Sequence, residues 1–465
     1  MTARQPIRSV VVLGAGLTGL SAAIAFARTL PGIGVLLIET PADPAALADR
    51  LPAILPSGLA FLDRLGFDPD GLVATGVAVP RTATRYAGWR PDASDALHVF
   101  GDADGMTGDF YRSWLALIRD GYPLPFHRHL ASGAAAEGER LSAATDPGSG
   151  SFALRLDPDR ARASFIHAAQ QLGVRMARGQ IVGAARREDG GVAAVLLDDD
   201  RRASADLFVD ATGPAALLAN LIERDSDATS FVDWSAILPE DRLTLDKRIG
   251  TDPSPVDRVE RTATGWRAEW SLGDHQLVGI ASAAAAPPLP AHSGDTIVLH
   301  PGRRQDPWRH NVLALGDAAA CAGALEWTGL PLAHAALELA LELLPGRDMH
   351  PLELAEYNRR WRLRADRIRD FLALLHPAGP THIRHASGVQ FARRGLLPHH
   401  EEETFERDSW VTMLLGLGVM PERADPRPPI HDAAGLAALA ARLDAAAAKM
   451  RSFPEALRRW QETSR

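Results

Sequence analysis

The strongest hydrophobic pattern of this chain lies near its start. A run of apolar, mostly β-branched residues at 10–13 predicts a buried strand, and an alanine-rich helix is predicted at 21–30. A second apolar run at 35–38 ends at the acidic Glu39. A strand, a turn, a helix and another strand in this order are typical of an α/β fold with a Rossmann-like sheet.

The turn between the first strand and the helix is rich in glycine. Gly14, Gly16 and Gly19 have the spacing G-x-G-x-x-G. The first glycine permits a tight turn, the second lets backbone N–H groups approach a pyrophosphate, and the third lets the helix pack closely on the sheet. Glu39 follows at slightly more than the usual distance for a carboxylate that binds a ribose hydroxyl. The sequence therefore predicts a dinucleotide site.

The apolar character of residues 9–27 allows a second interpretation. With Arg4 and Arg8 ahead of it, this stretch also resembles a signal peptide or a membrane anchor. The glycine spacing and Glu39 would then be coincidences, so we favour the nucleotide site and expect no membrane association.

The regular pattern returns in the middle of the chain. A helix is predicted from Pro158, with Asp157 as its N-cap. Strands are predicted at 175–178, 182–187, 193–197 and 207–209. The last of them runs into a small-residue turn. We therefore expect the chain to leave the first sheet, form a meander and return.

A third informative stretch lies near residue 320. A predicted buried strand meets Gly316 and Asp317, and a long helix begins near Thr328 and Gly329. The N-terminus of that helix can face an anion or a flavin edge. Glu326 lies in the apolar loop between them. Because a buried carboxylate without a partner is costly, Glu326 is either in a structural ion pair or a functional acid or base.

Two other segments carry candidate chemistry. Residues 81–89 alternate as a strand does, which places Arg81 and Arg85 on one face, either solvated or functional. His127 and His129 have strand-like spacing, either as a metal pair or as part of a polar surface strand. Because no other ligand residues cluster nearby in the sequence, we expect no metal site.

Composition narrows the function classes. The 465 residues leave room for two or three domains, and a net charge of -8 argues against a nucleic-acid-binding surface. The single Cys321 rules out a disulfide framework, and a cytoplasmic location is the default expectation. Only two lysines occur, Lys247 and Lys449. We expect a small molecule as the partner.

Several segments together resemble the flavin-dependent tryptophan halogenases, in order and in spacing, over nearly the whole chain. They are the glycine turn, DLFVDATG at 206–213, PGRRQDPWRHNVLALG at 301–316, LEWTG at 325–329, EYNRRWRLRADRIRDFLALLH at 356–376 and DSWVTMLLGLGVMP at 408–421. The resemblance implies an FAD-binding Rossmann-like box joined to a substrate module of mixed sheet and helices. It also implies that a separate reductase supplies FADH2, and that a halide ion is oxidised to hypohalous acid. That acid reaches a lysine beside a glutamate, where a tryptophan-like aromatic substrate is halogenated.

The resemblance carries over to individual positions. Glu326 falls on the family glutamate, and Thr328 with Gly329 on the residues that hold the halide. The expected cofactor-binding set is Gly14, Gly16, Gly19, Glu39, Gly213, Gly316 and Asp317.

The departures from the family pattern concern the chemistry. Counting back from Trp89, Arg81 takes the place of the lysine, and a guanidinium stays protonated and is a poor nucleophile. The WxWxIP signature keeps only its first tryptophan, Trp266, a substrate or tunnel residue by resemblance. The family's Gly-Glu-Ala motif reads LADRLPAILPS at 47–57. Asp317 replaces an apolar or amide residue, which resembles the flavin hydroxylases, where the carboxylate binds the ribityl chain.

Three functions stay open at this point. They are halogenation of an aromatic substrate, a flavin monooxygenase without halogenation, and a non-catalytic FAD-binding homologue. The oligomeric state is open as well, with a dimer among the options. We expect an FAD-binding first part (1–90), an insertion with substrate loops (91–156), a return and meander (157–213), a substrate-binding part (214–300), a closing FAD segment (301–345) and a helical module (346–465).

Overall fold

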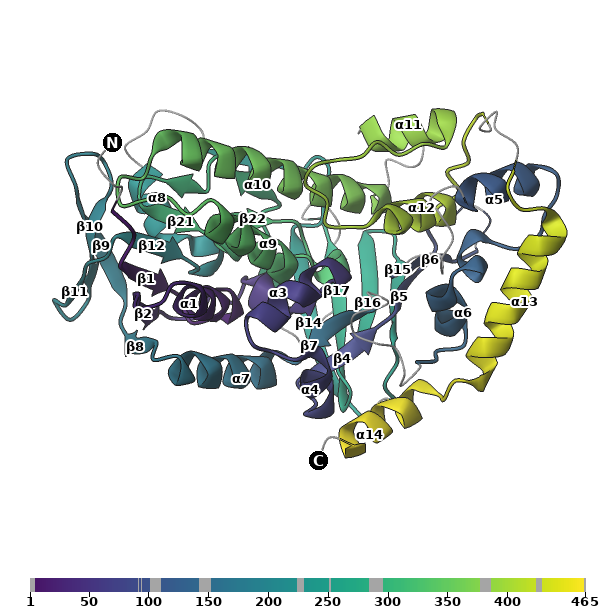
Figure 1. Ribbon diagram of the computed structural model, residues 1–465, viewed down its shortest axis with the longest axis horizontal. Coiled ribbons are helices and arrows are strands. Elements are labelled where there is room, and N and C mark those ends of the chain that lie inside the picture. The colour runs from purple at the N-terminus through teal and green to yellow at the C-terminus, as the bar shows by residue number, and fades with distance from the viewer. Residues whose placement is uncertain are drawn as a thin grey trace.

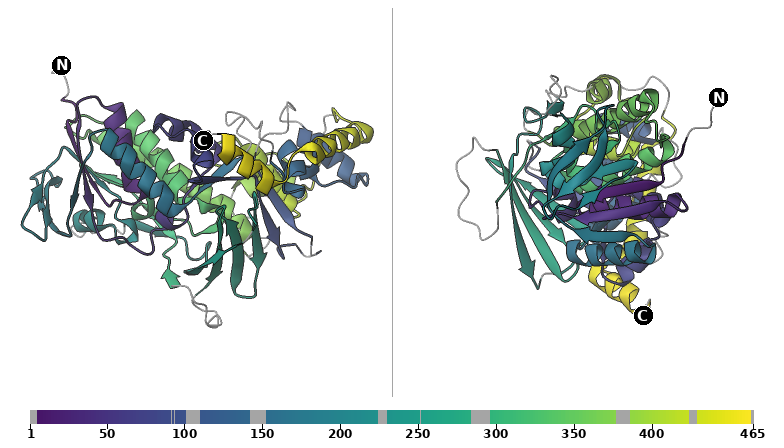
Figure 2. Two further views of the ribbon diagram at one scale, coloured as in Figure 1. Left: turned by 90° about the horizontal axis from the view of Figure 1, so that it is seen from below. Right: turned by 90° about the vertical axis from the view of Figure 1, so that its left-hand side faces the viewer.

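The computed structural model describes residues 5–90, 92, 94–100, 110–141, 152–223, 230–250, 252–283, 296–376, 386–423 and 429–463. The molecule is elongated, with a six-stranded sheet at one end and a seven-stranded sheet in the middle (Figure 1). The far end holds α5 (Phe110–Arg119), α6 (Ala131–Glu137) and α13 (Ala433–Lys449). Figure 2 shows the N-terminus beside the six-stranded sheet and the C-terminus over the middle of the molecule.

The six-stranded sheet contains the predicted Rossmann-like pattern. Its order is β20 (Trp308–Arg309), β21 (Val312–Ala314), β12 (Leu207–Asp210), β1 (Ser9–Leu13), β2 (Gly34–Glu39) and β8 (Arg175–Arg178). All neighbours are parallel except β20 and β21. Helix α1 (Leu17–Thr29) packs against α7 (Pro158–Gln171) and α9 (Gly329–Glu342). The expected return to the first sheet is therefore confirmed, because β12 pairs directly with β1.

The seven-stranded sheet carries most of the strands from the second half of the chain. Its order is β18 (Thr296–Val298), β14 (Arg242–Ile249), β17 (His275–Ser282), β16 (Gly265–Ser271), β15 (Val256–Arg261), β5 (Ala83–Ala87) and β6 (Ala96–Val99). It is antiparallel except between β5 and β15. This single parallel pair joins an early segment of the chain to a late one.

Three small sheets complete the strands. They are β11 (Arg202–Ala203), β10 (Val192–Leu197) and β9 (Ile181–Arg186); β13 (Phe231–Asp233), β19 (Gly302–Arg304) and β22 (Ala320–Cys321); and β3 (Ala53–Ile54), β7 (Ala153–Leu156) and β4 (Ala78–Arg81). The first of these is the predicted meander.

The remaining helices cover the sheets. They are α2 (Leu47–Arg50), α3 (Leu59–Arg64), α4 (Pro69–Ala74), α8 (Leu217–Glu223), α10 (Pro351–Leu372), α11 (Ala386–Arg394), α12 (Arg407–Gly416) and α14 (Phe453–Thr463). The predicted N-cap of α7 is confirmed, since the Asp157 side chain accepts a hydrogen bond from Arg160 N. In the described part of the chain, no helix has the length and apolar character that crossing a membrane requires.

Two predictions from strand-like patterns need correction. Residues 83–87 do form a strand, β5, but Arg81 ends β4 in another sheet, because the chain turns at Thr82, whose N–H donates to Pro255 O. The alternation of side chains between the two faces restarts at this turn. As a result, Arg81 is buried, whereas Arg85 is partly exposed beside Asp95. The second case is the segment Phe126–His129, which forms a 3₁₀ turn instead of a strand.

Candidate active site

The glycine turn after β1 is built by close backbone contacts. Gly14 has φ +96°, and a Cβ there would come 2.3 Å from the carbonyl oxygen of Ala211. A Cβ on Gly19 would come 1.9 Å from the carbonyl oxygen of Gly14. Because only glycine fits these positions, the turn stays tight and α1 packs directly on the sheet.

A cavity of about 760 Å³ lies in front of this turn. Gly14, Gly16, Glu39, Arg162 and Gly213 are among its lining residues. The Glu39 carboxylate accepts hydrogen bonds from Arg178 and Arg162, each at 2.7 Å, and these bonds lower its pKa. A cavity that meets a helix N-terminus at one end and an ionised carboxylate at the other fits the diphosphate and ribose of a dinucleotide.

Two further carboxylates lie at α2, and Asp49 is also among the lining residues of the cavity. Asp49 Oδ1 accepts a hydrogen bond of 2.6 Å from Leu17 N, at the first residue of α1. Asp317 Oδ2 accepts one of 2.8 Å from Ala48 N in α2. Burial raises the pKa of both carboxyl groups, that of Asp317 to about 7. Both groups are therefore easier to protonate than an exposed aspartate.

Glu326 has an unusual backbone conformation. Glu326 (φ 59°, ψ 1°) and Trp327 (φ 53°) both adopt the left-handed region, which non-glycine residues rarely occupy. Their 3₁₀ turn leads directly into α9. Strained conformations of this kind persist only where the surroundings hold them and cluster at functional sites. Here Trp327 packs edge to face on Trp270, with ring centroids 5.4 Å apart.

The Glu326 carboxylate is buried and fully engaged. Its Oε1 accepts a hydrogen bond of 2.5 Å from the Tyr86 hydroxyl and lies 2.8 Å from His98 Nδ1, and its Oε2 pairs with Arg81 Nη2. Burial opposes ionisation, but the positive charge of Arg81 and the contact with His98 outweigh it and hold the pKa of Glu326 well below its usual range. Glu326 is therefore an ionised carboxylate.

Arg81 joins Glu326 to a second buried ion pair. Its Nε lies 2.6 Å from Asp257 Oδ2, its Nη2 donates to Thr84 Oγ1 at 2.5 Å, and its Nη1 donates to the Glu326 carbonyl oxygen at 3.3 Å. The other oxygen of Asp257 pairs with Arg155. The four charged side chains are at most 1% exposed. Burial alone would lower the pKa of Arg81, but Glu326 and Asp257 outweigh it and raise that pKa. We call these four residues the charged cluster.

The predicted site residues fall into two groups. Arg81 and Glu326 touch, although 245 positions separate them, and Thr328 and Gly329 follow directly at the start of α9. Trp266 lies farther off, since it packs on Trp270 at 6.0 Å and Trp270 packs on Trp327. Gly316 and Asp317 are not among the lining residues of the 760 Å³ cavity, and Asp317 accepts a hydrogen bond from Ala48 N in α2.

Five side chains around Arg81 and Glu326 were missed by the sequence analysis. They are Thr84, Tyr86, His98, Arg155 and Asp257. The sequence held one signal for three of them, because His98, Arg155 and Asp257 are polar residues placed among apolar residues of short strands. His127 and His129, which the sequence offered as a metal pair or as part of a polar strand, both contact other side chains. His127 contacts Glu137, and among the described residues no group of three His, Cys, Asp or Glu could hold a metal ion.

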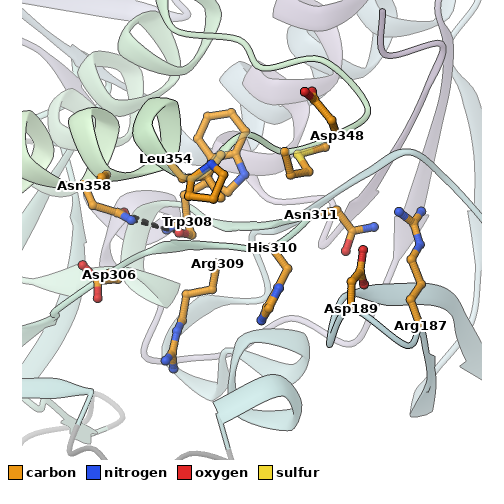
Figure 3. A pocket seen from close by; sticks show the side chains of 13 residues that line it. Arg187, Asp189, Asp306, Trp308, Arg309, His310, Asn311, Asp348, Leu354 and Asn358 are labelled. Carbon is orange, nitrogen blue, oxygen red and sulfur yellow. Dashed lines mark hydrogen bonds between the residues drawn. The ribbon is translucent and has the colours of Figure 1, made fainter. Parts of the chain in front are cut away.

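Another cavity, of about 460 Å³, lies between the β20–β21 hairpin and the start of α10 (Figure 3). The side chains of its two asparagines form hydrogen bonds with backbone groups. Asn358 bonds to both the N–H and the carbonyl of Trp308, and Asn311 does the same with Val192. None of the predicted site residues lines this cavity.

Comparison with known proteins identifies the family. A sequence profile described as Tryptophan halogenase matches residues 9–432. The chain belongs to the tryptophan halogenase family. Among curated family members, it is similar to tryptophan 7-halogenase RebH of Lentzea aerocolonigenes, at 23% identity over 90% of this chain and 91% of that one. Tryptophan 7-halogenase KtzQ of Kutzneria sp. is 24% identical over 79% and 75% of the two chains.

Solved structures of halogenases have the same fold. Xcc4156, a flavin-dependent halogenase from Xanthomonas campestris, superimposes with a TM-score of 0.86 at 24% identity, over 98% of this chain and 99% of that one. BrvH, a flavin-dependent halogenase from Brevundimonas sp. BAL3, has a TM-score of 0.84 at 24% identity, with the same coverage. The expected α/β fold with a second mixed-sheet and helical module is thus confirmed for this member of the halogenase family.

Proposed function

We propose that this chain is a flavin-dependent halogenase that acts on a small aromatic substrate. The observation that carries the proposal is the buried contact between Arg81 and Glu326, at the positions where the family has its lysine and glutamate. Membership of the family supports FAD as the cofactor, a separate flavin reductase as its source of electrons, and a halide ion as co-substrate. FAD bound at the glycine turn would supply, with oxygen, the oxidising equivalents.

The residues around the 760 Å³ cavity are suited to hold that cofactor. The N-terminus of α1 offers N–H groups to a diphosphate, and Glu39 with Arg162 faces a ribose. Asp317 is placed differently from a cofactor ligand, because its carboxylate caps α2. We therefore assign Asp317 a role in fixing α2 and keep the glycine turn, Glu39 and Gly213 as the cofactor-binding residues.

The start of α9 is suited to hold the halide. The Thr328 hydroxyl is buried and has no hydrogen-bond partner among the residues that the structure describes. It stands at the N-terminus of a 14-residue helix, where backbone N–H groups and the helix dipole favour an anion. Thr328 and Gly329 are therefore the proposed halide-binding residues.

Arg81 changes the chemistry expected beside Glu326. Both hydrogens of its Nη2 and one of its Nη1 are already donated, and its Nε faces Asp257, which leaves one Nη1–H. A protonated guanidinium does not form a covalent haloamine. The proposed role of Arg81 is to donate that remaining hydrogen bond to the oxygen of hypohalous acid and so orient its halogen toward the substrate. Glu326 holds Arg81 in this position.

The test is the mass of the product. The purified chain is supplied with FAD, a flavin reductase, NADH, oxygen and bromide, together with indole or phenol. We expect a product that carries bromine and whose formation requires bromide. A product that gains oxygen and no bromine would establish the monooxygenase instead, which the absence of a lysine amine favours. A yellow protein without any product would establish a non-catalytic homologue.

A further inference from the structure

The N-terminus of α1 is capped by a carboxylate from another part of the chain. Its N-cap residue, Gly16, has no side chain that could accept a hydrogen bond, and no acidic residue lies in the first turn of the helix. The acceptor comes from α2 instead, because Asp49 Oδ1 accepts a hydrogen bond of 2.6 Å from Leu17 N. The first N–H groups of a helix attract anions, and here a carboxylate of the protein itself takes that place.

The same carboxylate lies directly against the second glycine of the turn. A Cβ placed on Gly16 would come 1.9 Å from Asp49 Oδ2 and 2.5 Å from Asp49 Oδ1. A glycine at this position of the motif is what lets a pyrophosphate approach the backbone. The space that Gly16 leaves is filled by the two carboxylate oxygens of Asp49.

Hydrogen bonds, and not an ion pair, hold the Asp49 carboxylate at the helix. The arginine whose charge acts on it, Arg162, donates to Glu39 Oε1 at 2.7 Å and to the Ala15 carbonyl oxygen at 3.1 Å. Burial raises the pKa of Asp49 against the hydrogen bonds from the start of α1 and the charge of Arg162. A diphosphate has more charge and more acceptor oxygens than a carboxylate, and it is therefore the stronger partner for the same N–H groups.

Three other carboxylates in the lining of the cavity are bound away from the turn. Glu39 accepts hydrogen bonds from two arginines. Asp43 and Asp198 accept hydrogen bonds from backbone N–H groups outside the turn. Of these four lining carboxylates, Asp49 is the one whose oxygens contact the glycine turn and the start of α1.

We propose that the Asp49 carboxylate is an internal competitor of the FAD diphosphate, which displaces it from Leu17 N and from the space over Gly16. This inference rests on the proposed function, which gives the N-terminus of α1 to that diphosphate. A ligand that needs these groups binds only to molecules in which the carboxylate has moved away, so its apparent Kd is raised by a factor that does not depend on the ligand. Asp49 thereby keeps small anions, which have few other contacts, from binding at the turn.

Two variants of Asp49 separate displacement from charge repulsion. Asp49→Asn removes the charge but keeps an amide oxygen that can accept from Leu17 N, whereas Asp49→Ala frees this N–H. We expect the Kd of FAD, followed by flavin fluorescence, to fall a few-fold in Asp49→Asn and at least about tenfold in Asp49→Ala. Asp199→Ala, which removes an exposed carboxylate paired with Arg201, is the control and should keep the wild-type Kd. Equal Kd values in the two Asp49 variants, or a higher Kd in Asp49→Ala, would overturn the proposal.

Ligands that share only part of FAD give a second readout. The Kd of ADP and of inorganic pyrophosphate is measured by calorimetry, and each should fall in Asp49→Ala by the same factor as the Kd of FAD, because each ligand displaces the same carboxylate. Riboflavin and adenosine carry no phosphate and should bind to the wild type and to Asp49→Ala equally. Factors that grow with the charge of the ligand would show repulsion in place of displacement and overturn the proposal.

Thermal unfolding controls for a loss of structure in Asp49→Ala. Because this variant lacks the cap of α1, we expect a lower Tm without ligand and a larger rise in Tm on addition of pyrophosphate than in the wild type. A larger rise in the wild type would contradict the competition. None of these readouts requires bromination. A chain that shows them without a brominated product would refute the proposed function alone, whereas bromination with unchanged affinities in Asp49→Ala would overturn the role of Asp49 alone.

Discussion

The cofactor cradle, which is the 760 Å³ cavity in front of the glycine turn, is partly open to solvent, whereas the charged cluster is fully buried. The cradle is centred on the glycine turn at 14–17, and the rest of its lining comes from residues within 39–50, 158–162, 178–180, 198 and 211–213. The cluster comes from side chains on β4, β7, β15 and the turn before α9. The glycine motif of the cofactor site is therefore contained in a short stretch of sequence, whereas the charged cluster exists only through long-range pairing.

The two regions also treat their carboxylates differently. Asp49 and Asp317 accept hydrogen bonds from backbone N–H groups, and burial raises the pKa of each; at Asp49 it outweighs these bonds and the more distant charge of Arg162. Glu326 is buried at least as deeply, but the charge of Arg81 holds its pKa low. The partner, and not the burial, decides the ionisation state.

The largest expected effect is on turnover. Glu326→Gln removes the charge that holds Arg81 in position, and we expect bromination to fall about a hundredfold or more, as for the loss of a catalytic acid–base group. The Kd of FAD, followed by flavin fluorescence, should stay the same because the cradle does not include Glu326. Glu401→Gln, which removes an exposed partner of Arg359, is the control. A parallel loss of FAD binding would show that the two regions are not independent.

The next effect is on stability. Asp257→Asn leaves Arg81 and Arg155 without their shared carboxylate in a buried site, and we expect the free energy of unfolding to fall by about 3 to 5 kcal/mol. Urea unfolding measures it. Asp199→Asn breaks an exposed pair with Arg201 and should leave the unfolding midpoint unchanged. Similar midpoints for both variants would contradict a structural role for the cluster.

A smaller effect depends on pH. The Asp317 pKa is raised to about 7 in the folded chain, against 3.8 as the reference value. The folded state therefore binds more protons than the unfolded state between these values, and stability falls as pH rises through them. Asp317→Asn removes this loss. In FAD-free protein, we expect its Tm to exceed that of the wild type by a few degrees at pH 8 and to match it below pH 4. A constant Tm difference at all pH values would contradict the raised pKa.

The smallest effect concerns the affinity for FAD. The Asp49 carboxylate sits at the N-terminus of α1, where it adds negative charge beside the position of a diphosphate. Asp49→Asn should lower the Kd of FAD a few-fold, because the repulsion is worth only a fraction of a kcal/mol to about 1 kcal/mol. Asp198→Asn, which removes a carboxylate elsewhere in the cavity lining, is the comparison. A weaker affinity in Asp49→Asn would mean that this carboxylate contributes to binding.

The sequence predicts the glycine turn better than the charged cluster, because the turn is a local motif and the cluster depends on long-range pairing. The bounds of β8 and the N-cap of α7 were predicted closely, since short-range patterns determine them. The sequence also singled out Arg81 and Glu326, which the structure brings into contact, and their match to the lysine and glutamate of the family stays a prediction. The partners of Arg81 were not, because Thr82 takes the chain from one sheet to another and pairs β5 with β15, some 170 positions later. No local pattern contains that pairing.

The most direct test of the central claim is bromination by Arg81→Lys beside the wild type. The Arg81 guanidinium contacts Asp257, Thr84 and Glu326 at the same time. A lysine ammonium cannot make these three contacts together. We therefore expect at least about tenfold less product in Arg81→Lys, while Arg155→Lys, on the far side of Asp257, loses less. More brominated product from Arg81→Lys than from the wild type would contradict the account, since the site would then be complete except for a lysine amine.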